Sequence, residues 1–246
     1  MFPIRDHNPS ERTPYVTYAL IALNVVIFLS YWPLFNDERA LAAFYDTWGM
    51  RPIEIVNGIE TYTLLTSMFL HGGIMHLAGN MLFLYIFGDN LEEEMGHLGF
   101  LLFYLLGGLG ADLGQVLANP SSGVPVVGAS GAIAAVMGGY LLLFPKAKVD
   151  ILIIIVIIFK IFPVPAWVML GVWFALQLFN GVSNLGMTGG GVAYWAHAGG
   201  FIVGFALCLP LWLRRGGRDY WQRTDGHPPH PEASYNSSLP KVIRRK

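Results

Sequence analysis

The sequence is short of charged residues and of cysteine. Only 13% of its 246 residues are charged, against about 25% in an ordinary soluble domain. The one cysteine, Cys208, excludes an intramolecular disulfide framework and a cysteine-based metal site. The sequence has no His-Glu-x-x-His run, which disfavours a zinc metalloprotease. We expect no metal ion and no cofactor, and separately no nucleic-acid partner.

Long apolar runs are abundant instead. Hydrophobic residues make up 54% of the chain, and runs of about 20 residues, enough to cross a bilayer as a helix, recur between Tyr15 and Leu213. We predict an all-α, polytopic membrane protein with a six-helix bundle at residues 15–213. A cytoplasmic segment, 1–14, precedes it, and a polar tail, 214–246, expected to be disordered, follows. The six predicted spans are about 15–34, 67–87, 98–117, 126–144, 165–180 and 192–213, with an acidic turn at 88–96.

The segment from Val149 to Asn180 allows two topologies. It is apolar, but Lys160 and Pro163-Val164-Pro165 interrupt it. A span at Val149–Phe162 would raise the number of spans to seven. That piece is too short to cross as a helix, and its isoleucines are β-branched. We therefore assign it to the membrane interface.

The basic residues support six spans. With that topology one side of the membrane carries Arg5, Arg12, Lys146, Lys148, Arg214, Arg215 and Arg218. Lysine and arginine mark the cytoplasmic side. We therefore predict a protein of the bacterial cell (inner) membrane, with the lipid bilayer around it, both termini in the cytoplasm and its site open to the outer face.

Two reactive side chains lie within predicted spans. Ser130 is in the fourth span and His197 in the sixth, where polar groups are costly without a partner or a task. At 1.5 Å per residue both lie roughly 6–9 Å below the outer boundary, so they can meet. Histidine is the usual base that activates a serine hydroxyl as a nucleophile. Hydrolysis within the bilayer is therefore the predicted chemistry.

Small residues and donors surround this pair. Gly128 flanks Ser130, and Gly200 and Gly204 form a small-residue ridge that allows close helix packing. Attack on a carbonyl also needs hydrogen-bond donors for the developing oxyanion. His76 and Asn80 are four residues apart on one face of the second span and can point into one cavity.

Three ordered motifs carry a resemblance. HGGIMHLAGNM in the second span, GASGA in the fourth and AHAGG followed by Gly204 in the sixth resemble the rhomboid family of intramembrane serine proteases. The resemblance implies a Ser–His dyad without an acidic third member, acting on transmembrane protein substrates. It implies Ser130 as nucleophile and His197 as general base and acid. It implies His76 and Asn80, with the Ser130 N–H, as the oxyanion hole, and His71 as a supporting residue at the mouth.

The sequence departs from the family pattern at two places. Tyr62-Thr63 stands where many members carry Trp-Arg, which puts the anchoring of the outer loop in question. Ala134 stands where many carry an aromatic ring beneath the catalytic imidazole. The sequence offers three other aromatic candidates for orienting His197, namely Tyr140, Trp195 and Phe201.

Two other readings of the chain stay open. An inactive relative that binds transmembrane helices as a chaperone or adaptor would have the same fold, but such proteins typically lose the serine or the histidine. A transporter with a proton relay could use Asp112, although no internal repeat is visible. Asp112 could also face an aqueous cavity that brings in hydrolytic water, but we favour a helix–helix hydrogen bond for it. The motifs leave the substrates and the oligomeric state open.

Overall fold

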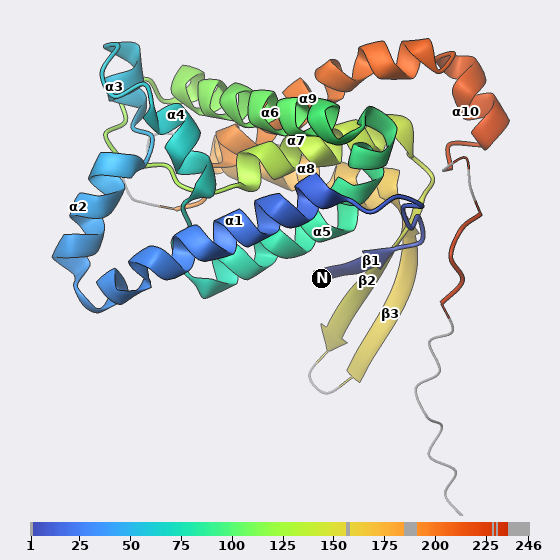
Figure 1. The fold of residues 1–246 in the computed structure, drawn as a ribbon, viewed down its shortest axis with the longest axis horizontal. Coiled ribbons are helices and arrows are strands. Elements are labelled where there is room, and N and C mark those ends of the chain that lie inside the picture. The colour runs from blue at the N-terminus through green and yellow to red at the C-terminus, as the bar shows by residue number, and fades with distance from the viewer. Residues whose placement is uncertain (1, 156–157, 185–190, 228, 230, 236–246) are drawn as a thin grey trace, which may run out of the picture.

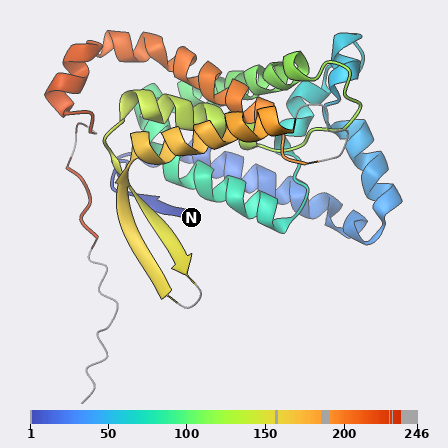
Figure 2. The same ribbon diagram turned by 180° about the vertical axis from the view of Figure 1, so that it is seen from behind.

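The computed structural model describes residues 2–155, 158–184, 191–227, 229 and 231–235 (Figure 1). Most of it is helical, as predicted. The bundle consists of α1 (Tyr15–Tyr31), α5 (Ile74–Met95), α6 (His97–Ala118), α7 (Ser130–Leu143), α8 (Ala166–Ser183) and α9 (Tyr194–Arg214). Shorter helices, among them α2 (Glu38–Trp48), gather at one end of the bundle, the α2 end. Helix α10 (Arg218–Thr224) and the base of a β-sheet lie at the other, the α10 end (Figures 1 and 2).

The helices have the lengths of membrane spans. Among the described residues, four segments are long and apolar enough to cross a bilayer, namely Tyr15–Asn36, α6, α8 and α9. A fifth crossing results if Thr63–Phe69 and α5 are taken as one span bent by 93°. Helix α7 is apolar but has only 14 residues. These helices agree with the predicted spans to within a few residues, apart from α5 and the late start of α7.

Helix α7 lies inside the bundle, and close packing against α9 holds it there. A Cβ atom built on Gly200 would lie 2.1 Å from the carbonyl oxygen of Gly131, and one on Gly204 would lie 2.0 Å from that of Ala135. No side chain larger than hydrogen fits at such distances. The predicted small-residue contact between the fourth and sixth spans is therefore present, and it brings the two backbones together.

Helix α5 corrects one prediction. It starts at Ile74, later than predicted, and continues to Met95, so residues 88–95 are helical rather than a turn. Glu92, within that segment, is 2% exposed. The error arose because three consecutive glutamates are typical of a solvated turn, and the sequence does not show what covers them.

Glu92 is buried because it caps another helix. Its carboxylate accepts hydrogen bonds from the backbone N–H groups of Val16 (2.9 Å) and Thr17 (2.7 Å) and from the Thr17 hydroxyl (2.7 Å). Pro14, the N-cap residue of α1, provides no side-chain cap. Glu92 thus satisfies the free N–H groups of α1 and places a negative charge at the positive end of its dipole.

The three-stranded sheet was not predicted. Strands β2 (Lys148–Ile155) and β3 (Ile158–Pro165) form an antiparallel hairpin that extends from the bundle, and β1 (Phe2–Asp6) pairs with β2 (Figures 1 and 2). The fold is therefore not purely α. The segment assigned to the interface is β-structure, in line with its β-branched residues.

The hairpin determines the direction of the last two long helices. At its base the N–H of Ala166 donates to the carbonyl of Ala147 (2.8 Å), and that of Trp167 donates to the carbonyl of Pro145 (2.9 Å). Helix α8 therefore starts where α7 ends, at the α10 end. Helix α9 then starts at the α2 end, as α7 does, which is the arrangement the six-span prediction required.

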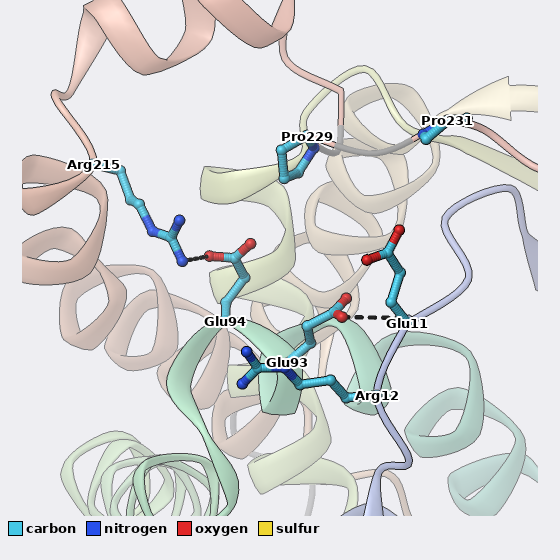
Figure 3. Close-up of a pocket in the computed structure, with 7 residues that line it drawn as sticks. All are labelled: Glu11, Arg12, Glu93, Glu94, Arg215, Pro229 and Pro231. Atoms are coloured by element: carbon cyan, nitrogen blue, oxygen red, sulfur yellow. Dashed lines mark hydrogen bonds and ion pairs between the residues drawn. The ribbon is translucent and has the colours of Figure 1, made fainter.

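The α10 end also corrects the prediction of a wholly disordered tail. Residues Arg218–Thr224 form α10, whose Trp221 ring lies 4.9 Å from that of Trp212 and whose indole N–H donates to the Leu142 carbonyl. Nearby, Arg215 at the end of α9 forms an ion pair with Glu94 at the end of α5 (Figure 3). These contacts attach the first part of the tail to the bundle.

At the α2 end the segment between α1 and α5 is anchored without a Trp-Arg pair. Arg51 lies among the carboxylates of Asp46, Glu54 and Glu60. The Tyr62 hydroxyl, at the first departing position, donates to the Thr47 carbonyl at 2.9 Å. Arg51 and Tyr62 therefore supply contacts within the segment between α1 and α5 that a Trp-Arg pair does not provide here.

Candidate active site

Ser130 is the first residue of α7, and the chain before it is shaped by Gly128. Gly128 has φ = +140°, a conformation that side chains rarely adopt, and its N–H donates to the Ser67 carbonyl at 2.9 Å. A Cβ atom there would lie 2.9 Å from Nε2 of His76. Glycine at this position therefore lets the chain pass close beside the His76 ring as it enters α7.

His197 lies in the first turn of α9, opposite Ser130. Its Nε2 atom is 2.7 Å from the Ser130 hydroxyl oxygen, within hydrogen-bond distance. The close approach of Gly131 and Gly200, one and three residues further along their helices, brings the two side chains together. The structure thus joins two residues that are 67 positions apart in the chain.

His76 and Asn80 point to the same place from α5. The N–H of Gly72 donates to Nδ1 of His76 at 3.1 Å. Because that nitrogen accepts, the proton of the neutral ring is on Nε2, the atom beside Gly128. The Asn80 side chain is 8% exposed and its amide nitrogen has no partner among the described residues. Two donors are thus available beside Ser130.

These side chains line one cavity of about 950 Å³. Ser130, His197, His76 and Asn80 all face it. Its wall also includes Asp112, whose carboxylate accepts a hydrogen bond from the Ser67 hydroxyl at 3.3 Å. That bond is the helix–helix contact we favoured for Asp112. The cavity has room for water and for a short extended piece of peptide chain.

His71 lies behind His76. It is fully buried, and its ring lies 5.1 Å from the His76 ring, edge to face. Its backbone is fixed by two tyrosine hydroxyls, since Tyr31 and Tyr45 both donate to its carbonyl, at 3.0 and 2.9 Å. His71 is therefore placed to support the position of His76 rather than to contact the Ser130 hydroxyl.

Two residues that were not among the predicted site residues contact His197. Gln177 on α8 lies with its amide oxygen 2.8 Å from Nδ1 of His197, and the Trp173 ring lies 5.8 Å from the imidazole at a 33° tilt. Gln177 could have been found by the reasoning used for Ser130, because it too is a polar residue inside an apolar run. Trp173 could not, because its ring resembles those of the other aromatic residues nearby.

The aromatic residues suggested for orienting His197 lie elsewhere. The Tyr140 hydroxyl donates to Asp6 at the α10 end, at 2.7 Å. Phe201 stacks on Phe174 at 4.7 Å, and Trp195 packs against Gly181. Trp173, on α8, is therefore the aromatic residue that lies beside His197, in place of the ring that Ala134 on α7 lacks.

Among the described residues no group of three or more His, Cys, Asp or Glu side chains is arranged to hold a metal ion. The polar side chains that line the cavity include hydroxyls, imidazoles, amides and the carboxylate of Asp112. Such a set suits acyl transfer by a nucleophile and a base.

The fold and the cavity define the class: a helical, multi-pass membrane protein with a hydrogen-bonded Ser–His pair at a cavity that several polar side chains line. The model of the Rhomboid domain matches residues 59–214. The chain belongs to the rhomboid family, and this membership supports an intramembrane serine protease type of function.

Several relatives carry the same family name. RHOMBOID-like protein 4 of Arabidopsis thaliana is 33% identical over 173 residues, which are 68% of this chain and 38% of that protein. Rhomboid protease GluP of Bacillus subtilis is 32% identical over 212 residues, 83% of this chain and 36% of that protein. Rhomboid protein 1, mitochondrial, of Saccharomyces cerevisiae is 30% identical over 195 residues, which are 77% of this chain and 51% of that protein. The chain thus spans about a third to a half of the length of these relatives.

Proposed function

We propose that the protein is an intramembrane serine endopeptidase that cleaves peptide bonds in or near transmembrane segments of other proteins. The observation that carries the proposal is the 2.7 Å contact between Ser130 Oγ and His197 Nε2 at the wall of the cavity that His76 and Asn80 also line. In an inactive relative that only binds helices, nothing would require this contact.

The proposed reaction starts with proton transfer from Ser130 to His197. The serine oxygen attacks the substrate carbonyl carbon, and the carbonyl oxygen becomes an oxyanion. His197 then gives the proton to the leaving amine, and the acyl group stays on Ser130. Water from the cavity, deprotonated by His197, attacks the ester and releases the second product with regeneration of the Ser130 hydroxyl.

Three donors are positioned for the oxyanion. They are Nε2–H of His76, the free amide N–H of Asn80 and the backbone N–H of Ser130. The Ser130 N–H is at the start of α7, where the first N–H groups of a helix have no intrahelical partner and the helix dipole favours negative charge. Donors fixed before the charge develops stabilise the transition state more than the ground state.

We also propose that the cavity opens to the outer face and that both termini are cytoplasmic. The basic residues Arg5, Lys146, Lys148 and Arg215 all make contacts at the α10 end, opposite the site. Lysine and arginine favour the cytoplasmic side. Placement in a bacterial inner membrane stays a prediction. Labelling of single cysteines at the α2 end by an impermeant thiol reagent, in intact cells, tests the orientation.

The proposed activity is tested with a fluorophosphonate probe and the purified protein. Labelling should occur in wild type and be lost in Ser130→Ala, with the folded state checked by thermal melting. Folded wild type that takes no label would contradict the protease and favour the inactive relative.

A further inference from the structure

His197 is held from two sides by different helices. Its Nε2 atom faces Ser130 on α7, and its Nδ1 atom lies 2.8 Å from the side-chain oxygen of Gln177 on α8. Gln177 is 8% exposed and stands behind the imidazole, away from the cavity wall. A polar side chain at this depth in an apolar helix is costly unless it is paired, and its pairing here is with the proposed base.

The orientation of the Gln177 amide follows from its second partner. Its nitrogen lies 3.4 Å from the main-chain carbonyl oxygen of Trp173, one turn earlier on α8. A carbonyl oxygen can only accept, so the amide nitrogen must face it. The amide oxygen is therefore left to face His197, and it too can only accept. Hence the proton of a neutral His197 ring belongs on Nδ1, and the lone pair belongs on Nε2, facing the serine.

We propose that Gln177 is a positioning residue that holds His197 in the tautomer able to take the Ser130 proton; this inference rests on the proposed protease function. A neutral imidazole has one N–H, and an acceptor beside one nitrogen selects which nitrogen bears it. In soluble serine proteases a carboxylate does this. A neutral amide does the same without bringing a negative charge into the span.

Trp173 completes the support. Its ring lies against the His197 ring, and its carbonyl fixes the Gln177 amide. Trp173 and Gln177 are four residues apart and so share one face of α8. Ala134 on α7 offers no ring for this purpose. The orientation of His197 in this protein therefore depends on α8 packing against α9, which Gly181 permits by lying close to Trp195 on α9.

The kinetic test uses Gln177→Leu and Gln177→Glu. Leucine has nearly the same volume but no acceptor, and it leaves the Nδ1–H unpaired. We expect kcat for a reporter transmembrane substrate to fall roughly 10- to 100-fold, the range for one unpaired buried donor. KM should stay within about twofold, since Gln177 does not face the cavity. Leu176→Ala, on the exposed side of α8, is the control and should behave as wild type.

Glutamate keeps the acceptor and adds a charge. Gln177→Glu should recover most of the activity lost in Gln177→Leu. Its acidic limb of kcat/KM against pH should move to higher pH, because a carboxylate beside Nδ1 stabilises the imidazolium. A loss of packing alone would not shift this limb. An unshifted profile in folded Gln177→Glu, or unchanged kcat in Gln177→Leu, would overturn the proposal while leaving the protease function intact.

A second measurement does not depend on activity. In protein labelled with ¹⁵N-histidine, the signals of His197 are assigned by their absence in His197→Gln. Wild type at neutral pH should show a protonated Nδ1 and an unprotonated Nε2, and Gln177→Leu should show a mixture of tautomers. If wild type has its proton on Nε2, or if the substitution changes nothing, Gln177 has no positioning role. If this pattern is found in protein that cleaves nothing, the proposed function fails and the tautomer assignment stands.

Discussion

The backbone N–H of Gly72 donates to Nδ1 of His76 and so turns the Nε2–H of that ring toward Gly128 and Ser130. The second candidate donor, Asn80, lies one turn further along α5, with its amide nitrogen unpartnered among the described residues. The His76 ring is oriented before any substrate arrives, and the Asn80 amide nitrogen has no competing acceptor among the described residues. This arrangement is what stabilisation of an oxyanion requires.

Removing either donor should slow the chemical step. We expect His76→Ala and Asn80→Ala each to lower kcat by about 10²- to 10³-fold, the effect of losing one oxyanion-hole donor. Met75→Ala is the control, because Met75 neighbours His76 but is 82% exposed. The kcat of each variant is measured by cleavage of a reporter transmembrane substrate by the purified protein. Variants that keep the wild-type kcat would exclude these residues from the oxyanion hole.

The contact between α7 and α9 should not tolerate a methyl group. In Gly200→Ala the new Cβ would lie 2.1 Å from the Gly131 carbonyl oxygen, and backbone cannot move aside easily. We expect a loss of about 1–3 kcal/mol in stability, as for other overpacked sites, and a lower rate because Ser130 and His197 separate. Thermal melting in detergent measures the first effect.

Gly79→Ala is the matched control for this substitution. Gly79 is also a helical glycine in the bundle, but a Cβ there meets nothing within 4 Å. Gly79→Ala should leave the stability unchanged or raise it slightly, since alanine is a better helix former than glycine. Equal melting temperatures for Gly200→Ala and Gly79→Ala would contradict the packing we describe.

Glu92 should contribute to stability through α1. In Glu92→Gln the side chain loses its charge and one of its acceptor oxygens, so N–H groups at the start of α1 lose partners. We expect a loss of about 1–3 kcal/mol. The exposed Glu38 in the first turn of α2 provides the comparison, and Glu38→Gln should change stability by less than about 0.5 kcal/mol. Thermal melts that rank the two variants the other way would show that Glu92 is not a cap.

The attachment of β1 should depend on pH through Asp150. Burial raises the pKa of Asp150, but hydrogen bonds from His7 and Arg5 outweigh burial and lower the pKa below its ordinary value. A carboxyl with a depressed pKa stabilises the folded state above its unfolded pKa of about 3.9, and this contribution is lost as the pH falls through the folded pKa.

Amide hydrogen exchange in Phe2–Asp6 measures this effect. Protection of β1 should be high at pH 7 and decline below about pH 4. In Asp150→Asn the amides of β1 should be less protected at neutral pH, and their protection should change less with pH. The protection of amides elsewhere in the chain should vary with pH as in wild type. Identical profiles for the two proteins would rule out Asp150 as the residue that attaches β1.

The sequence was informative wherever one residue type is costly in its surroundings. Ser130 and His197 could be identified because a polar side chain inside an apolar run is costly unless it has a partner or a function. The glycines beside them could be identified because glycine lets two helix backbones approach closely. Hydropathy located α1, α6, α8 and α9 to within a few residues, but not the start and end of α5 or the start of α7. The non-spanning assignment of Val149–Phe162 agrees with the hairpin, since fourteen residues are too few to cross as a helix and most of them are β-branched or apolar.

The rest depended on contacts between distant segments, which hydropathy does not encode. Arg5 meets Asp150 across 145 positions, so β1 could not be inferred from its own five residues. Glu92 was predicted to lie on the surface because its partners, the backbone N–H groups of Val16 and Thr17, are 76 and 75 positions away in the chain. Gln177 was not predicted as a partner of His197, because an aromatic ring was expected to orient that histidine.

The central claim is that Ser130 is the nucleophile and His197 its base. The most direct measurement is cleavage of a reporter transmembrane substrate by purified wild type, Ser130→Ala and His197→Ala, with all three shown by thermal melting to be folded. We expect wild type alone to cleave the substrate. Equal cleavage by wild type and Ser130→Ala would contradict it.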